Sequence, residues 1–162
     1  MNKLYIICVE DQREVLNAVV ADLQALESYL VLEECESAQE AWDVLEDIDA
    51  AGDLPALVIS DHVMPGQTGV DFLISLHQDE RFRATRKMLL TGLATHQDTI
   101  HAINRAAVDR YLEKPWQQER LLQYAKELLT GYILDKGLDY RAYLPVLDNA
   151  VLLEGLRRRG GE

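Results

Sequence analysis

The feature that most constrains the fold of this chain is a regular alternation of short apolar runs and helical patterns. The first and third runs are almost continuously apolar, which is typical of parallel strands covered by helices on both faces. The predicted strands are residues 4–9, 30–35, 56–60, 87–91 and 110–112. Five such β-α units predict a doubly wound α/β fold. We expect a flavodoxin-like parallel sheet with right-handed crossovers and strand order 2-1-3-4-5.

Capping signals mark the starts of three predicted helices. Ser37, Thr68 and Thr95 are each followed three residues later by an acidic residue, a spacing at which two side chains cap the first helical turn. A last helix of the β-α pattern is predicted to begin near Gln117. It carries a wide apolar stripe formed by Leu121, Leu122, Ala125, Leu128, Leu129, Tyr132 and Ile133.

The residues after this helix form a separate segment. We expect the sheet domain at residues 1–134, and a C-terminal helical extension or the start of a linker at residues 135–162. Leu144, Leu147 and Val151 predict a further short helix that starts or is interrupted at Pro145. Two alternatives follow for the apolar stripe: the tail folds back and covers it, or it stays exposed and pairs two copies as a possible homodimer.

The charge balance limits the classes of partner. The chain has 16 basic and 28 acidic residues, a net charge of −12, which disfavours direct binding to nucleic acid and favours divalent cations. No apolar run approaches the roughly 20 residues that span a bilayer, so no membrane segment is predicted. Cys8 and Cys35 lie in apolar runs and are expected to be buried, reduced thiols. These features together predict a cytoplasmic protein.

Acidic residues follow two strands that the predicted order makes neighbours. Glu10 and Asp11 follow the first strand, and Asp61 ends the third. Ligands of open α/β sheets bind beyond the carboxyl ends of the strands, where the strand order reverses. Three carboxylates there repel one another unless a cation lies among them, and Mg²⁺ suits oxygen ligands in a shallow site. The main-chain carbonyl of Val63 is a further candidate ligand, because a Pro-Gly turn carries the backbone round the metal.

A hydroxyl and an ammonium group are predicted at the same edge. The fourth strand ends in Thr91, and the fifth runs into Lys114. Facing a metal and a carboxylate, they form a cradle for a phosphoryl group, whose charge the metal and the ammonium neutralise. A carboxylate can act as the nucleophile, so Asp61 is the predicted phosphate acceptor. His62 is not expected to take part, because neighbours on an extended chain point in opposite directions.

As a set, these motifs resemble the receiver (CheY-like) domains of the two-component response regulators. The resemblance covers about residues 4–134. It is carried by Glu10-Asp11, residues 61–65 with Gly69, Thr91-Gly92 and Lys114-Pro115, and by Tyr111 as the switch aromatic. It implies that Asp11 and Asp61 bind Mg²⁺ directly, that Glu10 helps through water and that Val63 contributes its carbonyl. Thr91 and Lys114 would contact the phosphoryl group, and the Lys114–Pro115 peptide would be cis.

The resemblance also implies a function. Asp61 would take phosphate from a sensor histidine kinase or phosphotransfer protein. Thr91 would then follow the phosphoryl group, and Tyr111 would move inward and alter the face made by the fourth helix, fifth strand and fifth helix. Such a protein is no enzyme beyond its own phosphorylation and dephosphorylation.

Two other functions are alternatives to this one. The first is a docking or phosphorelay module without an output of its own. The second is a phosphatase of the haloacid-dehalogenase type, which needs a second Asp two residues after the nucleophile, where this chain has Val63.

The lifetime of the aspartyl phosphate is a further expectation. In this family the residues two beyond the acceptor Asp and two beyond the Thr flank the approach of water. Here these are Val63 and Leu93, which cannot orient a water molecule, so we expect slow hydrolysis. Gly92 argues weakly the other way, because it leaves the phosphoryl group more open.

Overall fold

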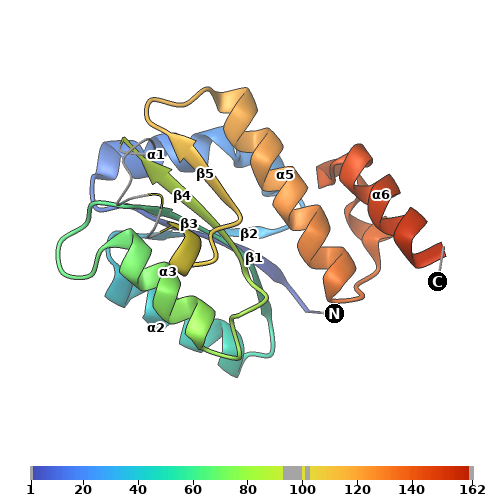
Figure 1. Ribbon diagram of the computed structural model, residues 1–162, viewed down its shortest axis with the longest axis horizontal. Helices are drawn as coiled ribbons and strands as arrows, with labels where there is room; N and C mark the ends of the chain where they lie inside the picture. Colours follow the sequence, from blue (N-terminus) through green and yellow to red (C-terminus); the bar gives the residue numbers. More distant parts are fainter. Residues whose placement is uncertain (1, 93–99, 101–102, 161–162) are drawn as a thin grey trace.

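The computed structural model describes residues 2–92, 100 and 103–160 of the chain. Its centre is a parallel sheet with strand order β2-β1-β3-β4-β5, which confirms the predicted fold class (Figure 1). The strands are β1 (Leu4–Val9), β2 (Val31–Cys35), β3 (Leu54–Asp61), β4 (Arg86–Thr91) and β5 (Arg110–Glu113). The carboxyl ends of all these strands therefore lie at one edge of the sheet.

The predicted start of the third strand was too late. β3 begins at Leu54 and includes Pro55, which pairs with Tyr5 of β1. A proline cannot donate a ladder hydrogen bond, and it is tolerated here because it lies next to the start of the strand. Its carbonyl oxygen accepts a hydrogen bond of 2.7 Å from the Thr85 hydroxyl.

Helices cover the sheet, and two of the three capping signals are confirmed. The helical elements are α1 (Arg13–Asp22), η1 (Gln24–Leu26), α2 (Ala38–Ala50), α3 (Gly69–Gln78), α5 (Gln118–Asp135), η2 (Tyr140–Val146) and α6 (Asn149–Gly160). The Ser37 side chain accepts a hydrogen bond from the Glu40 amide, and Thr68 accepts one from the Asp71 amide. Thr95 and the predicted start of the fourth helix lie outside the described residues. None of the described helices is both long and apolar enough to cross a membrane.

Two apolar layers form the core, one on each face of the sheet. Alternate residues of β1 supply them: Ile6 and Cys8 face α1 and α5, whereas Ile7 and Val9 face α2 and α3. Cys8 and Cys35 are both buried and unbridged, as predicted, and burial raises the pKa of the Cys35 thiol to about 12. Both thiols are therefore protonated at neutral pH.

The C-terminal segment folds back against α5, which is one of the two arrangements that the sequence left open (Figure 1). Leu147 and Leu152 are each only 6% exposed and belong to the same apolar cluster as Leu129 and Ile133 of α5. The Asp148 amide donates a hydrogen bond of 2.9 Å to the Thr130 hydroxyl. The end of the apolar stripe is thus covered by the chain's own tail.

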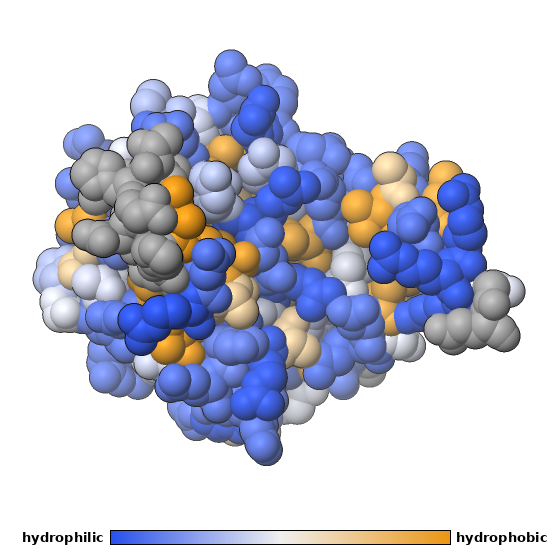
Figure 2. All heavy atoms as spheres, viewed as in Figure 1, coloured by the Kyte–Doolittle hydropathy of each residue, from blue (hydrophilic) through white to orange (hydrophobic). Residues whose placement is uncertain are grey.

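The predicted tail helix is in fact two elements. Pro145 lies inside the 3-10 segment η2, and α6 begins only four residues later. Leu144 is 46% exposed and does not join the buried cluster, because a 3-10 turn presents its neighbour Tyr143 to the core instead. The face drawn in Figure 2 is mostly hydrophilic, with hydrophobic atoms both over the sheet domain and over α6, where Leu153 is exposed.

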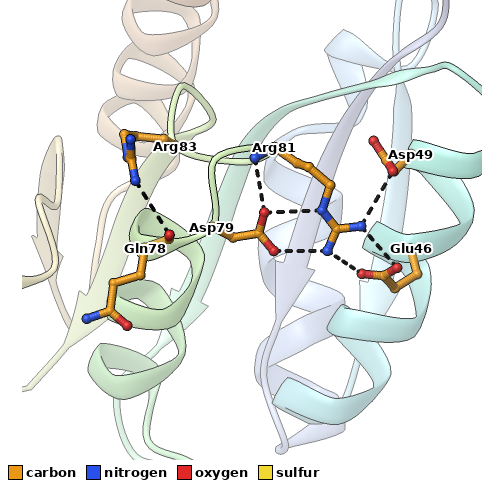
Figure 3. Close-up of polar contacts among 6 residues, drawn as sticks. All are labelled: Glu46, Asp49, Gln78, Asp79, Arg81 and Arg83. Atoms are coloured by element: carbon orange, nitrogen blue, oxygen red, sulfur yellow. Dashed lines mark hydrogen bonds and ion pairs between the residues drawn. The ribbon is translucent and has the colours of Figure 1, made fainter.

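A network of ion pairs links α2 to the connection between α3 and β4 (Figure 3). The Arg81 guanidinium donates to Asp79 in its own loop at 2.9 Å and to Glu46 of α2 at 2.6 Å, and it contacts Asp49 at 3.4 Å. It also lies 4.7 Å from the ring centroid of Phe82. Hydrogen bonds from Arg81 lower the pKa of the Asp79 carboxyl. The network joins the loop that leads into β4 to α2.

Lys87 of β4 is a buried base. Its side chain amine donates hydrogen bonds to the carbonyl oxygens of Thr85 at 2.7 Å and Arg83 at 3.1 Å. The residue is only 1% exposed. Burial lowers its pKa to about 8, and the nearby Arg86 acts in the same direction, although the Asp109 carboxylate opposes the shift.

We predict that Lys87→Met removes a pH dependence of stability. Below about pH 8 Lys87 is charged in both the folded and the unfolded chain, and its desolvation destabilises the fold. Between about pH 8 and 10.5 the folded chain loses this proton first, so the free energy of unfolding rises with pH. This contribution amounts to about 3 kcal/mol. Urea denaturation of both proteins across this range measures it, and parallel curves would contradict the prediction.

Candidate functional site

Three carboxylates meet at the carboxyl edge of the sheet. Val9 of β1 pairs with Ser60 of β3, so the residues that follow them are brought together. Glu10, Asp11 and Asp61 each offer one oxygen atom, and these atoms all lie within 4.8 Å of one another. Glu10 is 1% exposed and Asp61 is 6% exposed, so water screens their mutual repulsion poorly.

Lys114 supplies the positive charge at this edge. Its Nζ donates a hydrogen bond of 3.1 Å to Glu10 Oε1 and another to Asp61 Oδ1. Its main-chain amide donates to the Thr91 carbonyl at 3.0 Å, which fixes the end of β5 against the end of β4. Burial alone would lower the pKa of the Lys114 ammonium, but its hydrogen bonds and ion pairs with Asp61 and Glu10 raise it above the usual value.

The acidic cluster fits a hard divalent cation. Three carboxylates face one ammonium group, so negative charge remains in excess. Burial raises the pKa of Glu10, and the Asp61 charge acts in the same direction, although hydrogen bonds from Gln12 and Lys114 oppose it. A cation among these oxygens would offset both the burial of the Glu10 carboxylate and its repulsion from Asp61. Carboxylate oxygens are the donors that Mg²⁺ prefers.

A small cavity of about 220 Å³ opens beside the acidic cluster. Among its lining residues are five of the predicted site residues: Asp11, Asp61, Val63, Thr91 and Lys114. The Lys114–Pro115 peptide is cis. Tyr111 lies apart from this cavity, on β5, and is 48% exposed. Leu93, the second residue expected to flank the phosphoryl group, lies outside the described residues.

Two residues of the cavity wall were not predicted. Gln12 and His62 also line the cavity, although His62 was expected to point away from it. β3 ends at Asp61, so His62 is the first residue beyond the strand. Within the described part of the chain, His62 Nδ1 is buried and has no hydrogen-bond partner.

Gly69 allows the loop after Asp61 to return close to the site. Its amide donates a hydrogen bond of 2.8 Å to the His62 carbonyl. A Cβ atom at this position would overlap the carbonyl oxygen of Asp61. Only glycine fits at position 69, because the backbone there approaches the backbone of Asp61 and His62 closely. This close approach fixes the main chain that carries Asp61.

Comparison with known proteins identifies relatives of this chain. Residues 6–126 match the response regulator receiver domain family. Response regulator Rre1 of Synechocystis sp. is 33% identical over 124 residues, 76% of this chain and 51% of Rre1. The hydrogenase transcriptional regulatory protein HoxA of Bradyrhizobium diazoefficiens is 30% identical over 111 residues, 65% of this chain and 21% of HoxA.

A solved structure agrees with these matches. The signal receiver domain of an HD domain-containing protein from Pseudomonas fluorescens Pf-5 is 28% identical and superposes with a TM-score of 0.69. The match covers 81% of this chain and 98% of that domain. The chain thus spans about half or less of the two curated relatives, but almost the whole of a solved receiver domain.

We predict that Gly69→Ala destabilises the fold and displaces the Asp61 main chain. Relieving the overlap with the Asp61 carbonyl requires a backbone shift, which costs about 3 kcal/mol. Gly66→Ala in the same loop is the matched control. It meets no atom within 4 Å and carries only the strain of its positive φ, about 1 kcal/mol. Urea denaturation compares the variants, and equal losses of stability would refute the steric explanation.

Proposed function

The chain belongs to the response regulator receiver domain family, and we propose that it accepts a phosphoryl group on Asp61 from a sensor histidine kinase or phosphotransfer protein. One observation carries the proposal: the Asp61 carboxylate is buried at the end of β3 and is contacted by Lys114, with two further carboxylates beside it. A structural role alone does not account for three acids and one base gathered at one edge of the sheet, beside a small cavity.

The proposed reaction is a phosphoryl transfer between nucleophiles. An Asp61 oxygen forms a bond to phosphorus while the bond from phosphorus to the donor's histidine nitrogen breaks, and that nitrogen leaves with its electron pair. Glu10, Asp11, Asp61 and the Val63 carbonyl would hold Mg²⁺, which when bound neutralises charge on the transferred oxygens. Lys114 and Thr91 would contact the phosphoryl group, and Lys114 keeps its charge because its pKa is raised.

The consequence we propose is a switch of the face that includes β5 and α5. Thr91 ends β4 and lines the cavity, so it is placed to follow a phosphoryl group. Tyr111 is half-exposed on the adjacent strand and would move inward into the space that Thr91 leaves. The alternative is a phosphorelay or docking module without its own output. We propose a cytoplasmic location, and the net charge of −12 disfavours direct binding to nucleic acid.

We predict that acetyl phosphate with Mg²⁺ adds one phosphoryl mass to the wild-type chain and none to Asp61→Asn. The amide of asparagine cannot act as the nucleophile. Asp11→Asn should lose most of the Mg²⁺ dependence, because it removes one of the clustered carboxylates. Intact-protein mass spectrometry reads the result, and an unchanged mass gain in Asp61→Asn would disprove the assignment. Turnover of an added phosphoester would instead indicate a phosphatase.

We predict that the aspartyl phosphate is long-lived. Val63 lines the cavity but cannot hydrogen-bond a water molecule through its side chain. Because this side chain is 69% exposed, it shields the site only partly. Val63→Asn should therefore speed the loss of phosphate, by up to about 100-fold if the amide orients the water. Phosphate release in Mg²⁺ buffer measures the rate, with Leu93→Glu as a second variant. Unchanged rates in both would show that water exclusion is not the cause.

The homodimer is the remaining expectation about partners. The reason to expect it was an exposed apolar stripe on α5, but the tail covers the end of that stripe, and five of its seven residues belong to the buried core cluster. We therefore expect the chain to be a monomer whether or not it is phosphorylated. Light scattering at several protein concentrations measures the mass. A dimer mass would contradict this expectation and would indicate that two copies pair through another surface.

A further inference from the structure

A polar contact attaches the loop that carries Lys114 to a distant helix. Trp116 Nε1 donates a hydrogen bond of 2.8 Å to Asp22 Oδ2, the last residue of α1. The two residues are 94 positions apart in the chain. The indole is partly buried and also packs against the apolar layer that α1 and α5 share. Trp116 is thus fixed by packing and by a charge-assisted hydrogen bond.

The position of Asp22 is unusual for a carboxylate. It lies in the last turn of α1, at the negative end of the helix dipole, and this turn contains no basic residue. A carboxylate there is unfavourable for the helix itself. The indole N–H offers this charge a donor from outside the helix. The Asp22 carboxylate is therefore stabilised by a tertiary contact with Trp116 and not by its position in α1.

Other contacts of this loop are made by Lys114 with residues of the proposed reaction site. Lys114 Nζ contacts Glu10 and Asp61, and the Lys114 amide donates to the Thr91 carbonyl. Under the proposed function these partners change when Asp61 gains a phosphoryl group, because Lys114 then turns to the phosphoryl oxygens. The bond between Trp116 and Asp22 involves none of these groups. It attaches the loop two residues from Lys114 and does not depend on the groups that react.

We propose that Trp116, held by Asp22, is a positioning residue that keeps Lys114 in place for phosphoryl transfer to Asp61. The inference rests on the proposed function and adds a residue pair to it. Trp116 touches neither Asp61 nor the cavity that Asp61 lines, so its effect passes through the Lys114 main chain. Trp116 needs a hydrogen-bond acceptor at the end of α1, and Asp22 provides it.

The test measures the rate at which the full chain gains phosphoryl mass from acetyl phosphate and Mg²⁺. Trp116→Phe keeps an aromatic ring but loses the donor, and Asp22→Leu loses the acceptor. Each should slow the gain about three- to tenfold, since small misplacements of a reacting group can cost up to about 100-fold. Asp22→Asn keeps an acceptor oxygen and should retain most of the rate.

Gln123→Ala is the matched control. It removes a comparable hydrogen bond of 2.7 Å, from Gln123 to Asp148, between α5 and the start of α6. Its rate should equal that of the wild type. A second readout separates positioning from general loss of structure: in a Lys114→Ala background, Trp116→Phe should slow the reaction no further.

The outcomes distinguish this inference from the function on which it rests. Wild-type rates in both Trp116→Phe and Asp22→Leu would overturn the inference while leaving Asp61 as acceptor. The same holds for a further loss of rate when Trp116→Phe is added to Lys114→Ala. A wild-type chain that gains no phosphoryl mass overturns the proposed function and this inference together. If one variant does not fold, as judged by circular dichroism, the other tests the same bond.

Discussion

The attraction between the Lys114 ammonium and the carboxylates of Glu10 and Asp61 holds together an edge of the sheet that would otherwise repel itself. The strand order makes this repulsion unavoidable, because β1 and β3 are neighbours and both lead into acidic residues. Burial strengthens both the repulsion and the attraction, since water screens neither well. One base among three acids leaves negative charge in excess, which fits the cation proposed for this site.

The strand order and most of the site followed from the sequence because they depend on local patterns. Apolar runs located the strands within two residues, and once the order was assumed, the strand ends had to carry Glu10, Asp61, Thr91 and Lys114 to one edge. The start of β3 was missed because Pro55 cannot donate to a ladder. The place of Pro55 near the strand start depends on its pairing with Tyr5 of β1, which exists only in the folded chain.

Contacts between distant residues could not be read from the sequence in the same way. The bond from Trp116 to Asp22 joins two helix-end regions whose approach depends on how α1 and α5 pack on the sheet. The choice between a covered and an exposed stripe on α5 depended on the path of the tail, and no periodicity fixes that path. His62 lines the cavity, and the expectation that it takes no part in the chemistry stays a prediction.

The separation of the core into two layers has an optical consequence. The chain has only two tryptophans, and each lies against a different layer: Trp42 packs edge-on to Phe72 at 5.8 Å between ring centroids, on the side of α2 and α3, and Trp116 packs on the side of α1 and α5. Each face of the sheet thus carries its own intrinsic fluorophore. Emission from a chain that retains one indole reports on one face, so the order in which the two faces loosen can be observed without any added label.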